Sequence, residues 1–488
     1  MTGTVPAQPS AAWFEPTRVD DAPAAPWVRT HHAGVFDGRD VEYDAITGET
    51  ILTNEDGQPA ATIFSTAYVR TDIDSSAARP IVFFFNGGPG ASSSPLHLGV
   101  GPVRIPRSRD DSALAPNPPS PLDAVDMVFV DPVGTGYARL YEEGAGTPFW
   151  GIEEDADSLL FFVRDWLARQ ERSDSPVFLM GESYGAMRVV AMLARAGDLE
   201  LASALLLSPA LDMTAGTPIV GNNLPYIFLL PSMAATAAYH EVTERGGRSY
   251  SEIFEQAATF AETGYAAALQ RGARLDPEEA RRVGAKLAEL TGLPRSYLLE
   301  RNLRVTAPDF MDAVLGEQGL RVGRLDTRIT GRIEDYRDNR PPANDPSMAR
   351  GGGGGPSTGE RLDAYFSGAL NTRIDRPYRT LNLDLNSQWN FRREGAPRFY
   401  LSVAPLLQEA MSSRPALKIF VGGGVFDLGT PVLAARYLAT QVDTDPNRFT
   451  FAVYNGGHMV FEHEESRIRL CADIREFVTS TLNAAHDG

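Results

Sequence analysis

The sequence contains a single cysteine, Cys471, among 488 residues, and it has no long apolar run. One cysteine excludes an intrachain disulfide and a cysteine-rich metal site, so we expect no bound metal. No stretch reaches the roughly eighteen apolar residues that a membrane-spanning helix needs. The first residues also lack the basic start and apolar segment of a secretory signal. These absences predict a cytoplasmic protein that has no membrane partner.

Basic residues are scarce relative to acidic ones, with 45 Lys and Arg against 63 Asp and Glu and a formal net charge of -18. A nucleic-acid partner requires a basic face, so we expect none. Hydrophobic residues make up 43% of the chain and charged residues 22%, which is typical of a globular protein. The oligomeric state stays open, and a homodimer is one alternative.

Continuous apolar runs predict a sheet that helices cover on both faces. Between two of these runs, residues 153–169 show helical spacing and predict a crossover helix. Short runs of alternating apolar and polar residues over 31–69, separated by Gly and Asp, predict an antiparallel edge to the sheet. We therefore expect an α/β fold with a mostly parallel central sheet and an N-terminal antiparallel edge. The runs are 81–85, 127–130, 177–180, 204–207, 418–421 and 449–453.

The strand and helix alternation stops after residue 210, where helical stretches such as 250–270 and 277–290 take over. A glycine-rich stretch at 341–358 predicts a mobile loop, and it lacks the Lys and Ser or Thr of a phosphate-binding loop. Nothing in the sequence predicts a cofactor. We divide the chain into a loosely ordered or disordered arm (1–28), the first part of the core (29–210), an inserted helical cap (211–388) and the second part of the core (389–488).

A Gly-x-Ser-x-Gly motif occupies residues 181–185, directly after one of the buried strands. Such a motif forms the tight strand-to-helix turn on which α/β-hydrolases present a nucleophile. The flanking glycines are required because a side chain there would collide with the neighbouring strand or helix. Ser183 is therefore the candidate nucleophile.

In this fold the acid and then the base follow the serine along the chain. Four histidines come after Ser183: His240, His458, His463 and His486. His458 alone lies directly after a core strand and before the last helix, predicted over 464–482, so it is the candidate base. The alternative without a catalytic role is that His458 is a solvent-exposed histidine in a turn.

Asp427 is the candidate acid, because it lies in a glycine-rich turn after the strand that ends at 421. Thr430 and Pro431 are expected to cap and begin the next helix, which leaves Asp427 free to orient the imidazole. A surface aspartate in a turn is the alternative. An oxyanion hole would need two backbone N–H groups, one from Tyr184 and one from the glycine-rich loop after strand 81–85.

Taken together, these segments resemble the serine carboxypeptidase family, over the core from about residue 80 to 210 and from about 415 to 480. The resemblance implies that Gly88 and Tyr184 donate the oxyanion N–H groups. It also implies that Asn86 and Glu182 bind the terminal carboxylate of the substrate and that Met459 borders the pocket of the leaving residue. The matching blocks are Asn-Gly-Gly-Pro-Gly-Ala-Ser-Ser at 86–93, Asp-Pro-Val-Gly-Thr-Gly-Tyr at 131–137, Gly-Glu-Ser-Tyr-Gly at 181–185 and Gly-His-Met-Val at 457–460.

The chain departs from the family pattern at two places. Ala91 stands where the family has a cysteine. The second carboxylate-binding glutamate, which normally precedes a Gly-Pro pair, is absent, because residues 97–100 read His-Leu-Gly-Val before Gly101 and Pro102. Arg188 or a cap residue is an alternative carboxylate ligand.

The resemblance and the motifs predict a serine carboxypeptidase-like hydrolase. It would remove C-terminal residues from peptides through a Ser-His-Asp triad and an acyl-enzyme. Because the second glutamate is missing, an esterase or acyltransferase on the same triad is the first alternative. A non-catalytic binding protein with the hydrolase fold is the second.

Overall fold

The computed structural model describes residues 24–73, 79–106, 113–142, 148–336, 343–348, 356–393 and 401–486. The arm expected at 1–28 lies outside these ranges up to residue 23, and so does part of the glycine-rich stretch 341–358. None of the helices in the described ranges is long and apolar enough to cross a membrane.

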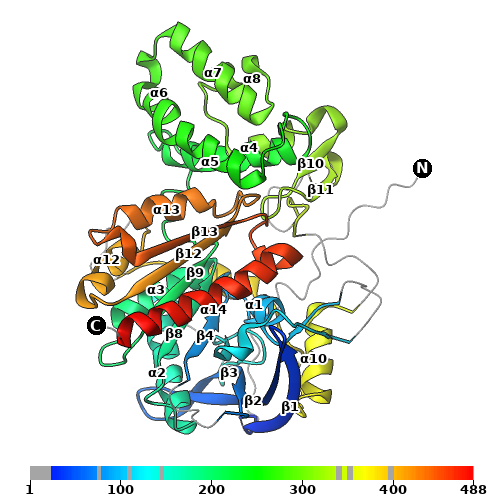
Figure 1. Cartoon of the computed structure of the whole chain (residues 1–488), viewed down its shortest axis with the longest axis vertical. Coiled ribbons are helices and arrows are strands. Elements are labelled where there is room, and N and C mark those ends of the chain that lie inside the picture. The colour runs from blue at the N-terminus through cyan, green and yellow to red at the C-terminus, as the bar shows by residue number, and fades with distance from the viewer. Residues whose placement is uncertain are drawn as a thin grey trace.

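Within the described residues, nine strands form one sheet in the order β1-β2-β3-β7-β4-β8-β9-β12-β13 (Figure 1). β1, β2 and β3 pair antiparallel, β3 pairs antiparallel with β7, and the other neighbours are parallel. The expected α/β-hydrolase sheet and its antiparallel N-terminal edge are confirmed. The bounds are β1 Val28–Phe36, β2 Arg39–Thr53, β3 Pro59–Arg70, β4 Ile81–Phe85, β7 Asp126–Asp131, β8 Val177–Glu182, β9 Ser203–Leu207, β12 Lys418–Gly424 and β13 Phe449–Tyr454.

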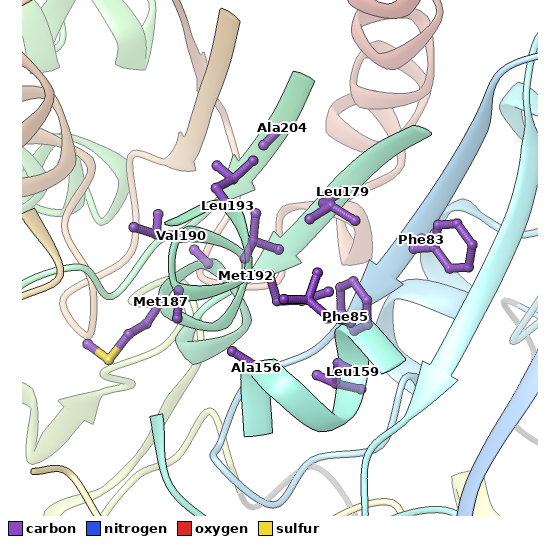
Figure 2. Close-up of a cluster of buried hydrophobic side chains, with 14 of the residues drawn as sticks. Phe83, Phe85, Ala156, Leu159, Leu179, Met187, Val190, Met192, Leu193 and Ala204 are labelled. Atoms are coloured by element: carbon purple, nitrogen blue, oxygen red, sulfur yellow. The ribbon is translucent and has the colours of Figure 1, made fainter. Parts of the chain in front are cut away.

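Alternate residues of the buried strands enter two separate apolar clusters, as the two-residue period of a strand requires. Phe83 and Phe85 of β4 pack with α2, α3 and α12, whereas Val82 and Phe84 pack with α1 and α14. Figure 2 shows the first cluster, in which Phe85 lies among residues of α2 and α3. The sheet is thus covered on both faces. The helices are α1 Ser94–Val100, α2 Ile152–Arg169, α3 Tyr184–Arg195, α12 Ala404–Ser413 and α14 Glu464–His486.

The cap is a third apolar cluster, which stands over the end of the sheet that contains β12 and β13 (Figure 1). It packs on Val425, Phe426 and Leu428, in the turn after β12, and on α13 (Val432–Thr440). The helix expected over 250–270 is interrupted by a π-turn at Ala261–Tyr265. The cap elements are α4 Leu224–Tyr239, α5 Tyr250–Phe260, α6 Ala266–Arg271, α7 Pro277–Thr291, α8 Arg295–Glu300, α9 Ala307–Ala313, β10 Leu320–Val322 and β11 Thr330–Arg332.

The last part of the expected cap packs on the core instead. In α10 (Thr358–Gly368), Leu362 and Phe366 join the cluster of β3 and β4, and the Phe366 ring lies 5.5 Å from the ring of Phe64. α11 (Leu383–Gln388) also packs on the core through Leu385. The expected boundary at 388 therefore differs from the structure. An amphipathic pattern reveals that a helix has an apolar face but does not reveal which surface that face covers.

Candidate active site

Ser183 occupies the turn between β8 and α3, with φ 61° and ψ -126°. A non-glycine residue is strained in this region and stays there only when its surroundings hold it. The Ser183 N–H donates to the Leu207 carbonyl at 2.9 Å, and the Ser183 carbonyl accepts from Ala210 at 3.1 Å. A Cβ on Gly185 would lie only 2.3 Å from the Phe85 carbonyl oxygen. The geometry is that of an elbow which exposes the serine at the carboxyl end of the sheet.

His458 and Asp427 meet in the structure, from the turns after β13 and β12. Asp427 Oδ2 lies 2.7 Å from His458 Nδ1, and Asp427 Oδ1 accepts the N–H groups of Gly429 and Thr430 at 2.7 and 3.1 Å. Burial alone would raise the pKa of Asp427. The charge of His458 and the hydrogen bonds from His458 and Thr430 overcome burial, so the pKa lies below its ordinary value. Asp427 is therefore a buried carboxylate held in one orientation.

Thr430 does not have the expected role of capping the helix that follows it. Helix α13 begins at Val432 with Pro431 at the cap position, so Thr430 does not cap the helix. Its hydroxyl lies 2.8 Å from Asp427 Oδ2, 2.8 Å from the Ser208 carbonyl oxygen and 3.0 Å from His458 Nδ1. Thr430 thus supports the acid and the base directly. The sequence interpretation missed this role, because Thr before Pro reads as a helix start.

The second ring nitrogen of His458 faces the elbow. His458 Nε2 lies 3.7 Å from Oε1 of Glu182, the residue directly before Ser183. Burial lowers the pKa of His458, but the charge and hydrogen bond of Asp427 and the charge of Glu182 outweigh burial and raise it to about 9. The imidazole therefore lies between two carboxyl groups, with Nδ1 on Asp427 and Nε2 near Glu182, the neighbour of Ser183 in the chain.

Glu182 and Asn86 form a buried pair. Asn86 Nδ2 donates to Glu182 Oε2 at 2.8 Å, and Asn86 Oδ1 accepts the Leu96 N–H at 3.1 Å, which defines the orientation of the amide. Burial raises the pKa of Glu182 above its ordinary value, against the charge of His458 and the hydrogen bond of Asn86. Glu182 therefore takes up a proton more readily than an exposed glutamate does.

The loop after β4 lies directly against the elbow. A Cβ on Gly87 would come within 2.5 Å of the Tyr184 nitrogen and 2.9 Å of the Ser183 Cβ. Gly88 follows with φ +101°, a conformation that favours glycine. The expected oxyanion donors, Gly88 and Tyr184, thus belong to adjoining segments. Met459 follows His458 and is half-buried.

Gly87→Ala is expected to lower kcat by at least about 100-fold, since losing one oxyanion donor costs about that much. The added methyl group forces the Gly87 loop away from the Tyr184 N–H. Steady-state kinetics together with thermal unfolding would measure this. Gly316→Ala is the control, because a Cβ there meets nothing within 4 Å. Wild-type kcat in a folded Gly87→Ala protein would contradict the expected geometry.

The residues before Gly101 and Pro102, where the second glutamate was sought, are closely packed. A Cβ on Gly99 would lie 2.5 Å from the Phe461 ring, so a larger residue there would require Phe461 to move. His97 is buried with Nε2 2.6 Å from the Tyr68 hydroxyl, and burial lowers its pKa to about 3, which keeps it neutral. Neither residue replaces a carboxyl group.

Arg188, the suggested alternative ligand, is 1% exposed. Its Nε donates to Asp155 Oδ2 at 2.5 Å, and its Nη1 donates to the Asn86 carbonyl. Arg188 therefore supports the Asn86 loop from behind. It is not oriented to bind a substrate.

A cap segment, residues 324–327, holds the turns of both the acid and the base. The Leu325 carbonyl accepts the His458 N–H at 2.6 Å, and the Arg324 carbonyl accepts the Leu428 N–H at 2.9 Å. The Thr327 N–H donates to the Phe426 carbonyl at 3.0 Å. These contacts are between backbone groups, so no side-chain pattern in the sequence could have indicated them. Within the described ranges, no three His, Cys, Asp or Glu side chains are grouped to hold a metal ion.

Part of the chain is similar to known proteins. Residues 65–196 match the serine carboxypeptidase family. Serine carboxypeptidase-like 38 from Arabidopsis thaliana is 34% identical over 137 residues, which are 25% of this chain and 26% of that protein. Pheromone-processing carboxypeptidase KEX1 from Meyerozyma guilliermondii is 32% identical over 124 residues, 25% of this chain and 18% of that protein. The matches thus span about a quarter or less of these relatives.

The fold extends the similarity beyond the matched segment. A solved prohormone-processing carboxypeptidase from Saccharomyces cerevisiae superposes with a TM-score of 0.54 and 15% sequence identity, over 88% of this chain and 91% of that one. This similarity in fold covers most of both chains. The chain is thus similar to the serine carboxypeptidase family over residues 65–196, and it shares the fold of a solved carboxypeptidase over most of its length.

Proposed function

We propose that this protein is a serine-type carboxypeptidase that removes the C-terminal residue of a peptide through an acyl-enzyme on Ser183. One observation carries the proposal: His458 is hydrogen-bonded to Asp427 through Nδ1, while its Nε2 lies 3.7 Å from Oε1 of Glu182, the residue before Ser183 in the elbow. The names of the relatives, all carboxypeptidases or carboxypeptidase-like, support a peptide substrate.

In the proposed reaction, His458 Nε2 takes the proton of Ser183 Oγ while that oxygen attacks the carbonyl carbon of the last peptide bond. The negative charge on the carbonyl oxygen is stabilised by the N–H groups of Gly88 and Tyr184. The C–N bond then breaks, and His458 gives its proton to the departing amine. Water, deprotonated by His458, attacks the ester and releases Ser183.

Glu182 and Asn86 are the proposed ligands of the substrate's terminal carboxylate, with the leaving residue beside Met459. A protonated Glu182 donates a hydrogen bond to that carboxylate, whereas an ionised one repels it. Because the pKa of Glu182 is raised, this donor persists to higher pH than an ordinary glutamate would allow. Binding of acid substrates should therefore weaken as pH rises through the pKa of Glu182, and binding of C-terminal amides should not.

The test compares an N-blocked dipeptide acid with its C-terminal amide and methyl ester. We expect the acid to have the lowest KM of the three at acidic pH, with this advantage lost in Glu182→Ala. Equal kinetics for all three would overturn the carboxypeptidase assignment. Failure of a fluorophosphonate to label Ser183 would favour a non-catalytic binding protein.

An esterase or acyltransferase on the same triad is the second candidate. The observation that favours it is that residues 97–100 contain no second carboxylate-binding glutamate and are closely packed, with a Cβ on Gly99 lying 2.5 Å from the Phe461 ring. This candidate predicts that the ester is cleaved and the dipeptide acid is not. Transfer of the acyl group to an added alcohol would separate an acyltransferase from an esterase.

Glu182→Gln is expected to shift the acidic limb of kcat/KM on a neutral ester substrate to lower pH by about one unit. The reason is that Glu182 helps to raise the pKa of His458 to about 9. Removing this negative charge lowers that pKa, so the base is neutral, and active, at lower pH. A pH–rate profile measures the shift, with Glu255→Gln on the cap surface as the control. If the acidic limb of kcat/KM moved to higher pH, the proposed effect of Glu182 on the pKa of His458 would be contradicted.

We also propose a cytoplasmic location, which rests on the single cysteine of the sequence. Fractionation of the source cells, followed by detection of the protein, would test it.

A further inference from the structure

The segment that returns from the cap to the core, residues 379–391, contacts both parts of the proposed oxyanion hole. We call it the return segment. Its α11 helix is capped by Asn382, whose Oδ1 accepts the Leu385 N–H at 3.1 Å, so the start of the helix is well defined. The resemblance to carboxypeptidases assigned no role to this stretch, and the sequence placed most of it in the cap.

The first contact is with the loop that contains Gly88. The Asn382 N–H donates to the Gly90 carbonyl at 2.8 Å, and Asn386 Nδ2 donates to the Pro89 carbonyl at 3.0 Å. The approach is so close that a Cβ on Gly90 would lie 2.3 Å from the Asn382 carbonyl oxygen. The loop is therefore bound to the return segment on the two residues after Gly88.

The second contact is with Tyr184, whose N–H is the other proposed donor. Trp389 Nε1 donates to the Tyr184 hydroxyl at 2.8 Å, and the two rings pack edge to face with centroids 5.4 Å apart. Both side chains are buried, with exposures of 7% for Trp389 and 3% for Tyr184. This hydrogen bond determines where the ring of Tyr184 lies at the start of α3.

The two donors lie on segments that are about a hundred residues apart in the chain, and the return segment is bound to both. An oxyanion hole works because its donors are already in place when the charge develops, and an error of about 1 Å can cost about 100-fold in rate. The return segment therefore has the position needed to fix the separation of the two N–H groups.

We propose that Asn386 and Trp389 are positioning residues that hold the N–H groups of Gly88 and Tyr184 at the spacing required by the developing oxyanion. This inference rests on the proposed acyl-enzyme mechanism. It does not depend on which acyl substrate the protein prefers.

The test uses Trp389→Phe, which keeps an aromatic ring and removes the indole N–H, and Asn386→Ala. The kinetics of each variant are measured on whichever substrate, the dipeptide acid or its methyl ester, the wild type cleaves faster. The affinity of each variant is then measured for a peptide boronic acid and for the product peptide. We expect kcat to fall about 10- to 100-fold, with KM unchanged within about twofold. Affinity for the boronic acid should fall with kcat, while affinity for the product stays the same.

Two controls match these changes. Trp150→Phe removes an indole N–H that donates to the Val133 carbonyl at 3.3 Å, in the same apolar cluster. Asn390→Ala removes an exposed amide of the same segment. Both controls should keep wild-type kcat, and thermal unfolding should show that all variants are folded.

An unchanged kcat in folded Trp389→Phe and Asn386→Ala would overturn the inference. So would equal losses of affinity for the boronic acid and the product, which indicate a general disturbance of the site. Failure of the proposed function appears separately, since it would show in the wild type as no fluorophosphonate labelling and no hydrolysis of either substrate.

Discussion

Ser183→Ala is expected to lower kcat by about 10⁶-fold, because removing the nucleophile of a serine triad abolishes nearly all its chemistry. The fold should be retained, since alanine differs only by the hydroxyl and the turn is held by backbone hydrogen bonds to Leu207 and Ala210. Fluorophosphonate labelling should disappear together with the activity. Steady-state kinetics and thermal unfolding measure the two effects.

Ser367→Ala, an exposed serine on α10, is the matched control and should behave as wild type. If Ser183→Ala kept more than about a hundredth of the wild-type kcat, the proposed acyl-enzyme would be contradicted, since an intact triad contributes far more than that.

Asp427→Asn is expected to lower kcat by about 10⁴-fold with little change in structure. Oδ1 of Asp427 accepts two backbone N–H groups, from Gly429 and Thr430, so the amide oxygen of Asn will occupy that position. The NH₂ group then faces His458 Nδ1 and donates to it. The imidazole is left with its proton on Nε2, the nitrogen that must accept the proton of Ser183.

The same change removes the main charge that raises the pKa of His458 to about 9. The small remaining activity should therefore appear at lower pH than in the wild type, and a pH–rate profile would show it. Asp126→Asn is the control: that buried aspartate bonds Arg79 and Arg172, so its loss should lower the melting temperature without changing the pH profile. Wild-type kcat in folded Asp427→Asn would remove Asp427 from the triad.

Local patterns in the sequence were sufficient to predict the elbow and the buried strands of the core. The glycines around Ser183 predicted the elbow because only glycine tolerates the contact of Gly185 with Phe85, and that contact is present. Runs of apolar residues predicted the buried strands because strands covered on both faces have no polar side. The order of Ser183, Asp427 and His458 along the chain followed from the topology of the sheet, in which late parallel strands end at the same edge.

Contacts between distant segments required the structure. Thr430 reads as a helix cap in the sequence, yet its hydroxyl lies on Asp427 and His458, because the helix begins only at Val432. Arg188 reads as a free cation near the elbow, but Asp155 on α2 binds it. His458 lies 28 residues from Thr430, and Asp155 lies 33 residues from Arg188, so neither of these contacts leaves a local pattern in the sequence.

The sequence by itself thus determined the fold class, the elbow and the candidate triad, because these depend on residue type and on order along the chain. Only the tertiary structure decided that Phe461 lies against Gly99, that residues 324–327 of the cap bind the turns of Asp427 and His458, and that residues 379–391 bind both the loop after Gly88 and Tyr184. Most of these contacts join backbone groups, or side chains hundreds of residues apart. Their positions depend on how the helices and loops pack, which no local pattern records.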